Sequence, residues 1–228
     1  NENQRKNGYE RRLGDWKTAV QECIVTGYNA EVRDGLAKIC FDLEMSVGAA
    51  CRLEYAVNGK GELQVRMDYR PLKDGLQLIP KVGMRMRIPA EYSQVSWYGR
   101  GPHENYPDRK SGYFIGQYRM PLDEFIFDYA SPQDNANRCD TRWFSLGNGS
   151  RDIEIHGLQE LNFRAWPYGE EDLEGSAHPF DIPARDFINV NIDFKIHGVG
   201  GNDGWGARTM DAYTIDPAQP YSFGFIIR

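Results

Sequence analysis

The stretch ACRLEYAVNGKGELQVRMDY, residues 50–69, decides the fold class. Apolar and polar residues alternate in both of its arms, residues 50–57 and 62–69, as they do in strands with one covered face and one solvated face. Between the arms, Asn58 and Gly59 tolerate the positive φ angles that a tight turn needs. The stretch therefore predicts an antiparallel β-hairpin.

The same period of two recurs along most of the chain. Residues 81–88 place Val82, Met84, Met86 and Ile88 on one face, and residues 187–196 alternate like a half-exposed strand. Further strands are expected at residues 36–45, 94–98, 152–156, 161–166 and 221–227. Short strands at this spacing, separated by Gly, Pro and Asn, predict an all-β antiparallel sandwich rather than a parallel α/β sheet.

Helix is scarce in this sequence. The best candidate is EEDLEGSA, residues 170–177, whose acidic residues stand at the favourable N-terminal end. The chain shows no internal repeat, no low-complexity tract and no obvious linker. Residues 1–228 are therefore interpreted as one domain, a common size for an all-β unit.

Charge and composition disfavour several classes of partner. With 27 basic and 33 acidic residues the net charge is -6, which argues against nucleic acid as the main partner. No apolar run approaches the roughly 18 residues of a membrane-spanning helix, and no apolar core follows NENQRKNGYERR to make a signal peptide. The aromatic content of 13% fits either a rich β core or a surface that stacks on sugars.

The residues that could bind a metal ion are dispersed. Cys23, Cys40, Cys51 and Cys139 lack the spacing of a zinc site, and reduced buried thiols are the simpler interpretation. Calcium loops place carboxylates at every second position, which the segment GNDG, residues 201–204, does not. No metal site is expected in this chain.

The segment GVGGNDGWG, residues 198–206, places a bulky tryptophan among five glycines. A dinucleotide-binding loop is disfavoured, because Asp203 stands where the last glycine of that fingerprint belongs and no helix pattern follows. Two interpretations of Trp205 are open. Either it folds back to fill its own domain, or the loop presents it to something outside.

A second segment, WYGRGPHENYPDR at residues 97–109, is dense in polar and aromatic groups. It holds Glu104 and Asp108, and a glycosidase needs two carboxylates at close range. Arg109 adjoins Asp108, however, and a neighbouring cation lowers the pKa of a carboxyl, which suits an acid catalyst poorly. A polar cluster that locks a long loop is the competing interpretation.

In a third segment, QDNANRCDTRWFSL at residues 133–146, alternation would turn Arg138, Asp140 and Arg142 to one side of an extended chain. Such a row is either a salt-bridged face or a set of donors to sugar hydroxyls. The histidines show no HExxH spacing, and no GxSxG elbow occurs. No catalytic residue is assigned to this chain.

Taken in order, WYGRGPHENYPDR, NRCDTRWF and DFINVNIDFKIHGVGGNDGW closely resemble the C-terminal domain, or small chain, of the large β-galactosidases of glycoside hydrolase family 2. The resemblance runs from about Asn1, where Glu2 and Asn3 look like the tail of a P-T-[DE]-N segment, to Arg228. It implies a large antiparallel β super-sandwich, related to galactose-mutarotase-like domains, with very little helix. It also implies that the catalytic glutamates and the magnesium and sodium sites lie in other domains, so no cofactor is expected here.

By this resemblance the chain is a non-catalytic domain that completes the substrate site of a separate TIM barrel, which cleaves terminal β-D-galactosides. The family's loop tryptophan stacks on substrate, and the matching ring is Trp205, with Asp203 and Asn202 beside it as substrate-binding candidates. The expected partners are β-galactoside sugars and the catalytic barrel. Where the family has Asp and Ser before the tryptophan, this chain has Asn202 and Gly204, which removes side chains that could hold the loop.

Two other functions are weighed beside this one. An autonomous carbohydrate-binding module would use an aromatic surface that includes Trp143, Trp166 and Trp205. An aldose epimerase needs a general acid and a general base, and no epimerase motif surrounds His103 or His178. The first strands of the family domain are expected to be absent, which would leave an unpaired edge and favour self-association. The compartment is left open, with the cytoplasm or periplasm of a bacterium expected.

Overall fold

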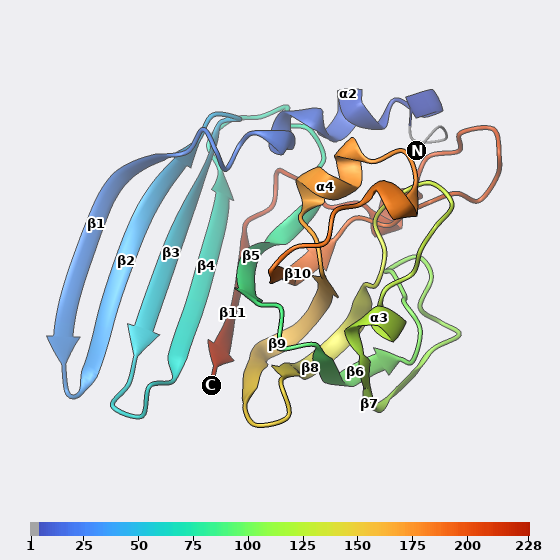
Figure 1. The fold of residues 1–228 in the computed structure, drawn as a ribbon. Helices are drawn as coiled ribbons and strands as arrows, with labels where there is room; N and C mark the ends of the chain where they lie inside the picture. The colour runs from blue at the N-terminus through green and yellow to red at the C-terminus, as the bar shows by residue number, and fades with distance from the viewer. Residues whose placement is uncertain (1–4) are drawn as a thin grey trace. The chain divides into compact units, whose positions relative to one another are not determined.

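The computed structural model describes residues 5–228, which are built mainly from antiparallel strands (Figure 1). In these residues the strands are β1 Ile24–Arg33, β2 Leu36–Met45, β3 Ala49–Val57, β4 Leu63–Pro71, β5 Lys81–Pro89, β6 Gln94–Gly101, β7 Phe114–Pro121, β8 Arg138–Gly147, β9 Asp152–Trp166, β10 Phe187–Ile196 and β11 Tyr221–Ile227. The helices are α2 Tyr9–Leu13, α3 Leu122–Phe125 and α4 Glu170–Gly175, with 3₁₀ turns at Gly14–Lys17, Pro179–Asp181 and Asp211–Tyr213. The predicted antiparallel all-β class with little helix is confirmed. Asn1, Glu2 and Asn3, where the family resemblance begins, lie outside the described residues.

Contacts within the chain divide it into two units. The meander unit contains residues 5–82, Ile155–Gln159 and Gly200–Arg228. The α4 unit contains Gly83–Glu154 and Glu160–Val199. Strand β9 contributes residues to both units, and the expectation of one domain over residues 1–228 stays a prediction.

In the meander unit the strands follow one another in the order β1, β2, β3, β4 and β11, each antiparallel to the next. The predicted hairpin is present, since β3 and β4 pair along their whole lengths. Its turn is held by Asn58, whose Oδ1 accepts hydrogen bonds from the backbone N–H groups of Lys60 (2.9 Å) and Glu62 (3.1 Å). Gly61 supplies the left-handed φ of 83° that the turn requires.

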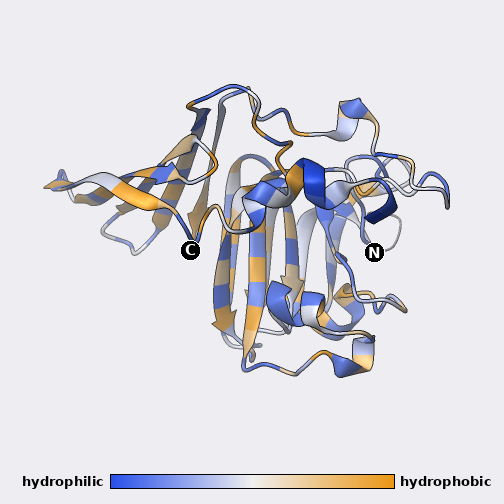
Figure 2. Cartoon of the chain, turned by 90° about the horizontal axis from the view of Figure 1, so that it is seen from above, coloured by the Kyte–Doolittle hydropathy of each residue, from blue (hydrophilic) through white to orange (hydrophobic). Residues whose placement is uncertain are grey.

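The two faces of this sheet differ in chemistry. Residues opposite one another across an antiparallel ladder point to the same side, so the registers assign each side chain to a face. The apolar face consists of Val25, Tyr28, Ala30 and Val32 of β1, Ala37, Ile39, Phe41, Leu43 and Met45 of β2, Ala49, Cys51, Leu53, Tyr55 and Val57 of β3, and Leu63, Val65, Met67, Tyr69 and Pro71 of β4. The polar face carries charged residues on the same strands, among them Lys38, Asp42, Arg52, Glu54, Arg66 and Asp68. Figure 2 shows this kind of alternation as successive hydrophobic and hydrophilic bands along strands.

Segments from both ends of the chain pack on β4. The indole Nε1 of Trp16 donates a hydrogen bond to the carbonyl of Gln77 (2.9 Å), and its ring lies 6.0 Å from that of Tyr69 between centroids. Tyr69 also stacks on Tyr221 of β11 and donates from its hydroxyl to the carbonyl of Pro217 (2.9 Å). The core of the meander unit is therefore centred on β4 and β11.

In the α4 unit the sheet runs in the order β9, β8, β6 and β7, and β10 pairs with both β9 and β5. Strand β6 is antiparallel to β7 and β8, and β10 is antiparallel to β9. Aromatic rings fill the core. Phe144 stacks on Phe163 with 4.1 Å between centroids, and Trp97 meets Phe125 edge to face at 5.4 Å. All four side chains are fully buried.

Strand β10 corrects one expectation. Its alternation predicted a half-exposed strand, yet every residue from Ile188 to Asp193 is buried. The polar side chains on one face meet other polar groups instead of water: Asn191 Nδ2 donates to Glu170 Oε1 of α4 (3.0 Å), and Asp193 lies 4.0 Å from the Arg164 guanidinium of β9. The pattern identified the face correctly, but polar neighbours cover it.

Candidate functional site

The three predicted substrate-binding residues lie together in one exposed loop of the meander unit. Trp205 is 91% exposed, and Asn202 and Asp203 beside it are exposed as well. This exposure is incompatible with the interpretation in which Trp205 folds back to fill its own domain. The ring is open to contact from outside the chain.

Asp203 holds the loop in shape. Its Oδ1 accepts hydrogen bonds from the backbone N–H groups of Trp205 (2.8 Å) and Ala207 (3.1 Å). The Ala207 and Trp205 N–H groups stabilise the charged form and keep the pKa of Asp203 below its usual range. A side-chain hold on the loop is thus present, at Asp203 rather than at the two positions where the sequence departs from the family pattern.

Glycines set the path of the same loop. Gly200, Gly201 and Gly206 have φ values of 64°, 72° and 92°, in the left-handed region that other residues rarely adopt. A Cβ at Gly206 would lie 3.0 Å from the Cβ of Lys6, so the backbone passes close to the N-terminal segment. The far end of the loop therefore lies against the N-terminal segment, while Trp205 remains at its exposed tip.

Glu104 and Asp108 tie segments of the α4 unit together. Glu104 Oε2 accepts from the backbone N–H of Ala136 (2.6 Å), and its Oε1 accepts from the hydroxyl of Tyr129. Asp108 Oδ1 accepts from the backbone N–H of Val199 (3.1 Å). Both carboxylates are engaged by distant segments, as the interpretation of a polar cluster that locks a loop requires.

The expected row of Arg138, Asp140 and Arg142 is not formed. The Arg138 guanidinium is buried 4.1 Å from the ring centroid of Phe125, and burial lowers its pKa to about 10. Asp140 has a left-handed φ of 52°, which interrupts the alternation, and it pairs with Arg100 at 2.5 Å. Two members of the row are therefore committed to contacts inside the α4 unit.

The three tryptophans named for a carbohydrate-binding surface are not exposed together. Trp166 is 1% exposed, and its Nε1 donates to the carbonyl of Asn135 (3.2 Å). Trp143 is half-buried. Of the three tryptophans named from the sequence, Trp205 alone presents most of its surface.

An ionic cluster on the polar side of β9 and β10 was not predicted from the sequence. Arg164 is buried and pairs with Asp134, with Glu170 at 3.8 Å and Asp193 at 4.0 Å. Burial opposes the charge, but Asp134 and Asp193 outweigh it and raise the pKa of Arg164. The polar alternation in residues 187–196 was the available signal, and it was interpreted as a solvated face.

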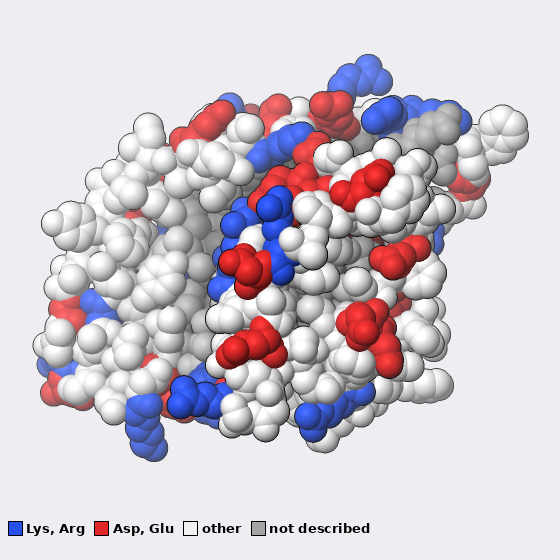
Figure 3. Space-filling view, in the orientation of Figure 1, with Lys and Arg blue, Asp and Glu red and all other residues white. Residues whose placement is uncertain are grey.

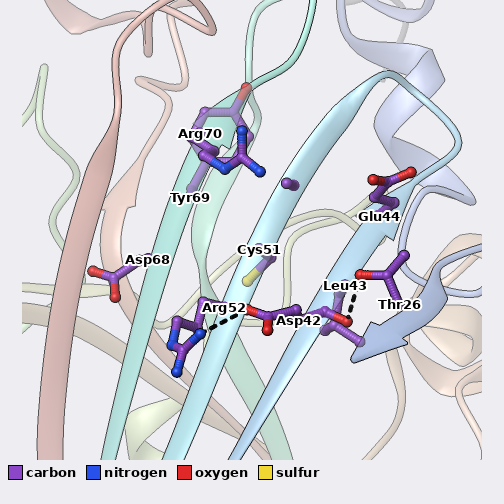
Figure 4. A pocket seen from close by; sticks show the side chains of 10 residues that line it. Thr26, Asp42, Leu43, Glu44, Cys51, Arg52, Asp68, Tyr69 and Arg70 are labelled. Carbon is purple, nitrogen blue, oxygen red and sulfur yellow. Dashed lines mark hydrogen bonds and ion pairs between the residues drawn. The ribbon is translucent and has the colours of Figure 1, made fainter. Parts of the chain in front are cut away.

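A shallow hollow lies on the sheet of the meander unit (Figure 4). Arg52 Nη1 donates to Asp42 Oδ1 (2.9 Å), and Thr26 Oγ1 donates to the carbonyl of Asp42 (3.2 Å). The volume of the hollow is about 130 Å³, whereas pockets that enclose small ligands measure about 300–1,000 Å³. It is not assigned as a sugar site.

Among residues 5–228, no group of three or more His, Cys, Asp or Glu side chains is gathered as metal ligands would be. No helix in that part of the chain is long and apolar enough to cross a membrane. The four cysteines are free, and burial raises the pKa values of Cys51 and Cys139 to about 12. Such thiols are protonated and unreactive, as structural cysteines are.

Residues 1–227 match the family described as beta galactosidase small chain, and this chain belongs to that family. It is 31% identical over 224 residues to a β-galactosidase of Priestia megaterium, an alignment that covers 97% of this chain and 22% of that enzyme. It is 30% identical over 223 residues to a β-galactosidase of Halalkalibacterium halodurans, covering 94% of this chain and 22% of that enzyme. The chain therefore spans about a fifth of the length of the curated relatives it matches.

Among solved structures, the chain is similar to galactose 1-epimerase from Lactobacillus acidophilus NCFM, with a TM-score of 0.47 and 8% sequence identity over 88% of this chain and 65% of that one. It is also similar to an aldose epimerase homologue from C. elegans, with a TM-score of 0.43 and 9% identity over 88% of this chain and 67% of that one. No activity is carried over from a likeness of this kind.

Proposed function

We propose that this chain is a non-catalytic domain of a β-galactosidase, and that it completes the substrate site of a separate catalytic barrel by presenting Trp205. The family match over residues 1–227 supports the assignment to such an enzyme. The 22% share of the relatives' length agrees with a domain whose catalytic groups, and whose magnesium and sodium sites, lie elsewhere. The role of Trp205 rests on one observation, its 91% exposure on a loop that Asp203 holds in shape.

The proposed contact follows from the surfaces involved. A galactoside ring presents C–H groups on one side, and an indole offers a large flat apolar surface with few rotatable bonds to immobilise. The hydrogen bonds to Asp203 hold the backbone of Trp205 before any sugar arrives. The interaction therefore adds apolar contact area to a site whose chemistry belongs to the barrel.

The test is steady-state hydrolysis of lactose by the whole β-galactosidase that carries this chain, with Trp205→Ala. Losing an apolar contact of about 1.5–3 kcal/mol raises KM by roughly 10- to 100-fold. We expect kcat to change less, because the contact binds substrate and transition state alike. The matched control is Phe180→Ala, since Phe180 is also an exposed ring (83%) outside this loop and its loss should leave KM unchanged.

An unchanged KM in Trp205→Ala would refute the substrate contact. Hydrolysis of a β-galactoside by the 228-residue chain alone would refute the non-catalytic assignment. Trp205→Phe separates stacking from a merely structural role, because it keeps an aromatic ring and should retain more of the affinity than Trp205→Ala.

The carbohydrate-binding module has less support. A module that holds an extended glycan needs several exposed rings along its surface, whereas Trp166 is buried and Trp143 is half-buried. Binding of the isolated chain to insoluble polysaccharide would support the carbohydrate-binding module instead.

A further inference from the structure

The apolar face of the meander unit is covered unevenly. In β4, Val65 and Tyr69 are 2% and 4% exposed, whereas in β1, Tyr28 and Val32 are 76% and 81% exposed. On β2 and β3, between them, most side chains of this face are half-buried, Phe41 of β2 among them. Figure 3 shows this side of β1 to β4 as a largely uncharged surface. Exposure thus rises steadily from the packed strand to the edge strand.

This face has the composition of a core rather than of a solvated surface. No position assigned to it on β1 to β4 carries a charged or amide side chain, whereas the opposite face carries residues such as Asp42, Arg52 and Asp68. Antiparallel sheets commonly have one solvated face and one face packed on other apolar groups. Here the polar face is the solvated one. The exposed apolar side chains on the other face are therefore those of an interface.

The chemistry of the face narrows what can cover it. Sugars are held by polar groups that pair with their hydroxyls, and this face offers aliphatic side chains and a few tyrosines. A membrane surface rich in anionic lipid attracts basic clusters, whereas this chain has a net charge of -6. Apolar protein surface is the complement that remains, because sheets pack face to face through interdigitating apolar side chains.

We infer that the apolar face of β1 to β3 is the docking surface for the remaining polypeptide of the same β-galactosidase, which covers it with an uncharged layer of aliphatic and aromatic side chains. The inference rests on the proposed function and names the partner surface within it. The chain spans 22% of the length of its relatives, so most of such an enzyme lies outside it and is present at equal concentration to fill this face. Val25, Tyr28 and Val32 of β1 are among the large exposed side chains that this contact buries.

The test compares two cysteine variants of the whole enzyme that differ only in the face they occupy. Val32→Cys lies on the apolar face and Ile24→Cys on the polar face, and both replace exposed aliphatic residues of β1 (81% and 67%). Each is treated with an uncharged maleimide, native and in urea, and labelling is read by mass spectrometry of the peptide. We expect Val32→Cys to react about tenfold or more slowly than Ile24→Cys in the native enzyme, because reaction then requires local opening. The two should react equally in urea.

Equal native rates at the two positions would overturn the inference, and so would protection of both. Protection of Val32→Cys that disappears on dilution to single protomers would assign the face to a second copy. Protection that appears only with phosphatidylcholine vesicles containing phosphatidylglycerol would assign it to a bilayer. Val25→Cys, on the same face, replaces Val32→Cys if that variant fails to fold. The labelling needs no substrate, so its result is independent of the Trp205→Ala kinetics.

Discussion

Strands β1 and β10 are both ten residues long, and each reverses the usual relation between polarity and burial. In β1 the apolar Tyr28 and Val32 are exposed, whereas in β10 the polar Asn191 and Asp193 are buried. The difference lies in what faces each strand, since the β10 polar groups meet Arg164 and α4. Alternation in a sequence identifies the side chains that share a face. Whether that face is exposed to solvent depends on other segments of the protein, about which the alternation carries no information.

The largest loss of stability is expected from removing the positive charge of Arg164, which lies near the polar side chains of β10. Arg164→Met removes a buried guanidinium that faces the buried Asp193 and the exposed Asp134, and leaving a buried carboxylate without its cation costs about 3–5 kcal/mol. Urea unfolding of the 228-residue chain measures the loss. Arg142→Met is the matched control, because Arg142 pairs with the exposed Glu160, and such surface pairs contribute about 0–1 kcal/mol. Similar losses in the two variants would show that the buried Arg164 contributes no more to stability than a surface ion pair does.

A milder comparison uses one substitution in both strands. Val190→Thr places a hydroxyl on the fully buried apolar face of β10, which costs about 1–3 kcal/mol if the hydroxyl finds no partner. Val32→Thr places the same hydroxyl on the exposed side of β1, where substitutions usually change stability by less than about 0.5 kcal/mol. Thermal unfolding of the isolated chain gives both values. Equal losses would mean that β1 is already covered when the chain is alone.

The smallest expected effect is on the pH dependence of stability at acidic pH. Hydrogen bonds from Arg185 lower the pKa of Asp172 in α4, assisted by the backbone N–H of Gly169. A carboxyl with a lowered folded pKa adds stability above its unfolded pKa of about 3.9 and loses it as the pH falls through the folded pKa. Arg185→Gln should therefore lower the melting temperature at neutral pH, and the two curves should converge as the pH falls below that folded pKa. A constant difference at every pH would exclude this linkage.

Much of the fold could be predicted from the sequence, because period-two alternation and turn residues are local signals. The predicted hairpin, β2, β5, β10 and β11 all occur. Strand β9 was expected as two strands, since Gly157 and its neighbours look like a break. It continues because Gly157 pairs with Phe225 of β11, and Gln159 donates to the carbonyl of Gly224 (3.2 Å). Strand β1 was missed because an irregular register near Gly27 interrupts its alternation.

The candidate loop was found because its residues are consecutive and match a family pattern. The hydrogen bonds that Asp203 accepts within this loop could not be predicted, because they depend on how the backbone of residues 203–207 turns back toward the Asp203 side chain. The ionic cluster around Arg164 was beyond the reach of sequence patterns for another reason. Its partners Asp134 and Asp193 stand about 30 positions away on either side, and no local spacing relates them.

The hydrogen bonds of the Trp205 loop have a consequence for selectivity. The N–H groups of Trp205 and Ala207 already donate to Asp203, so they do not address ligand hydroxyls. An indole face makes no directional hydrogen bonds to hydroxyls, so by itself it does not distinguish an axial hydroxyl from an equatorial one. A ligand that touches this ring is therefore accepted for its C–H surface, and the choice among stereoisomers has to be made by polar groups elsewhere. Under the proposed function, the loop would serve as a tolerant platform for the part of a galactoside that varies from one substrate to the next.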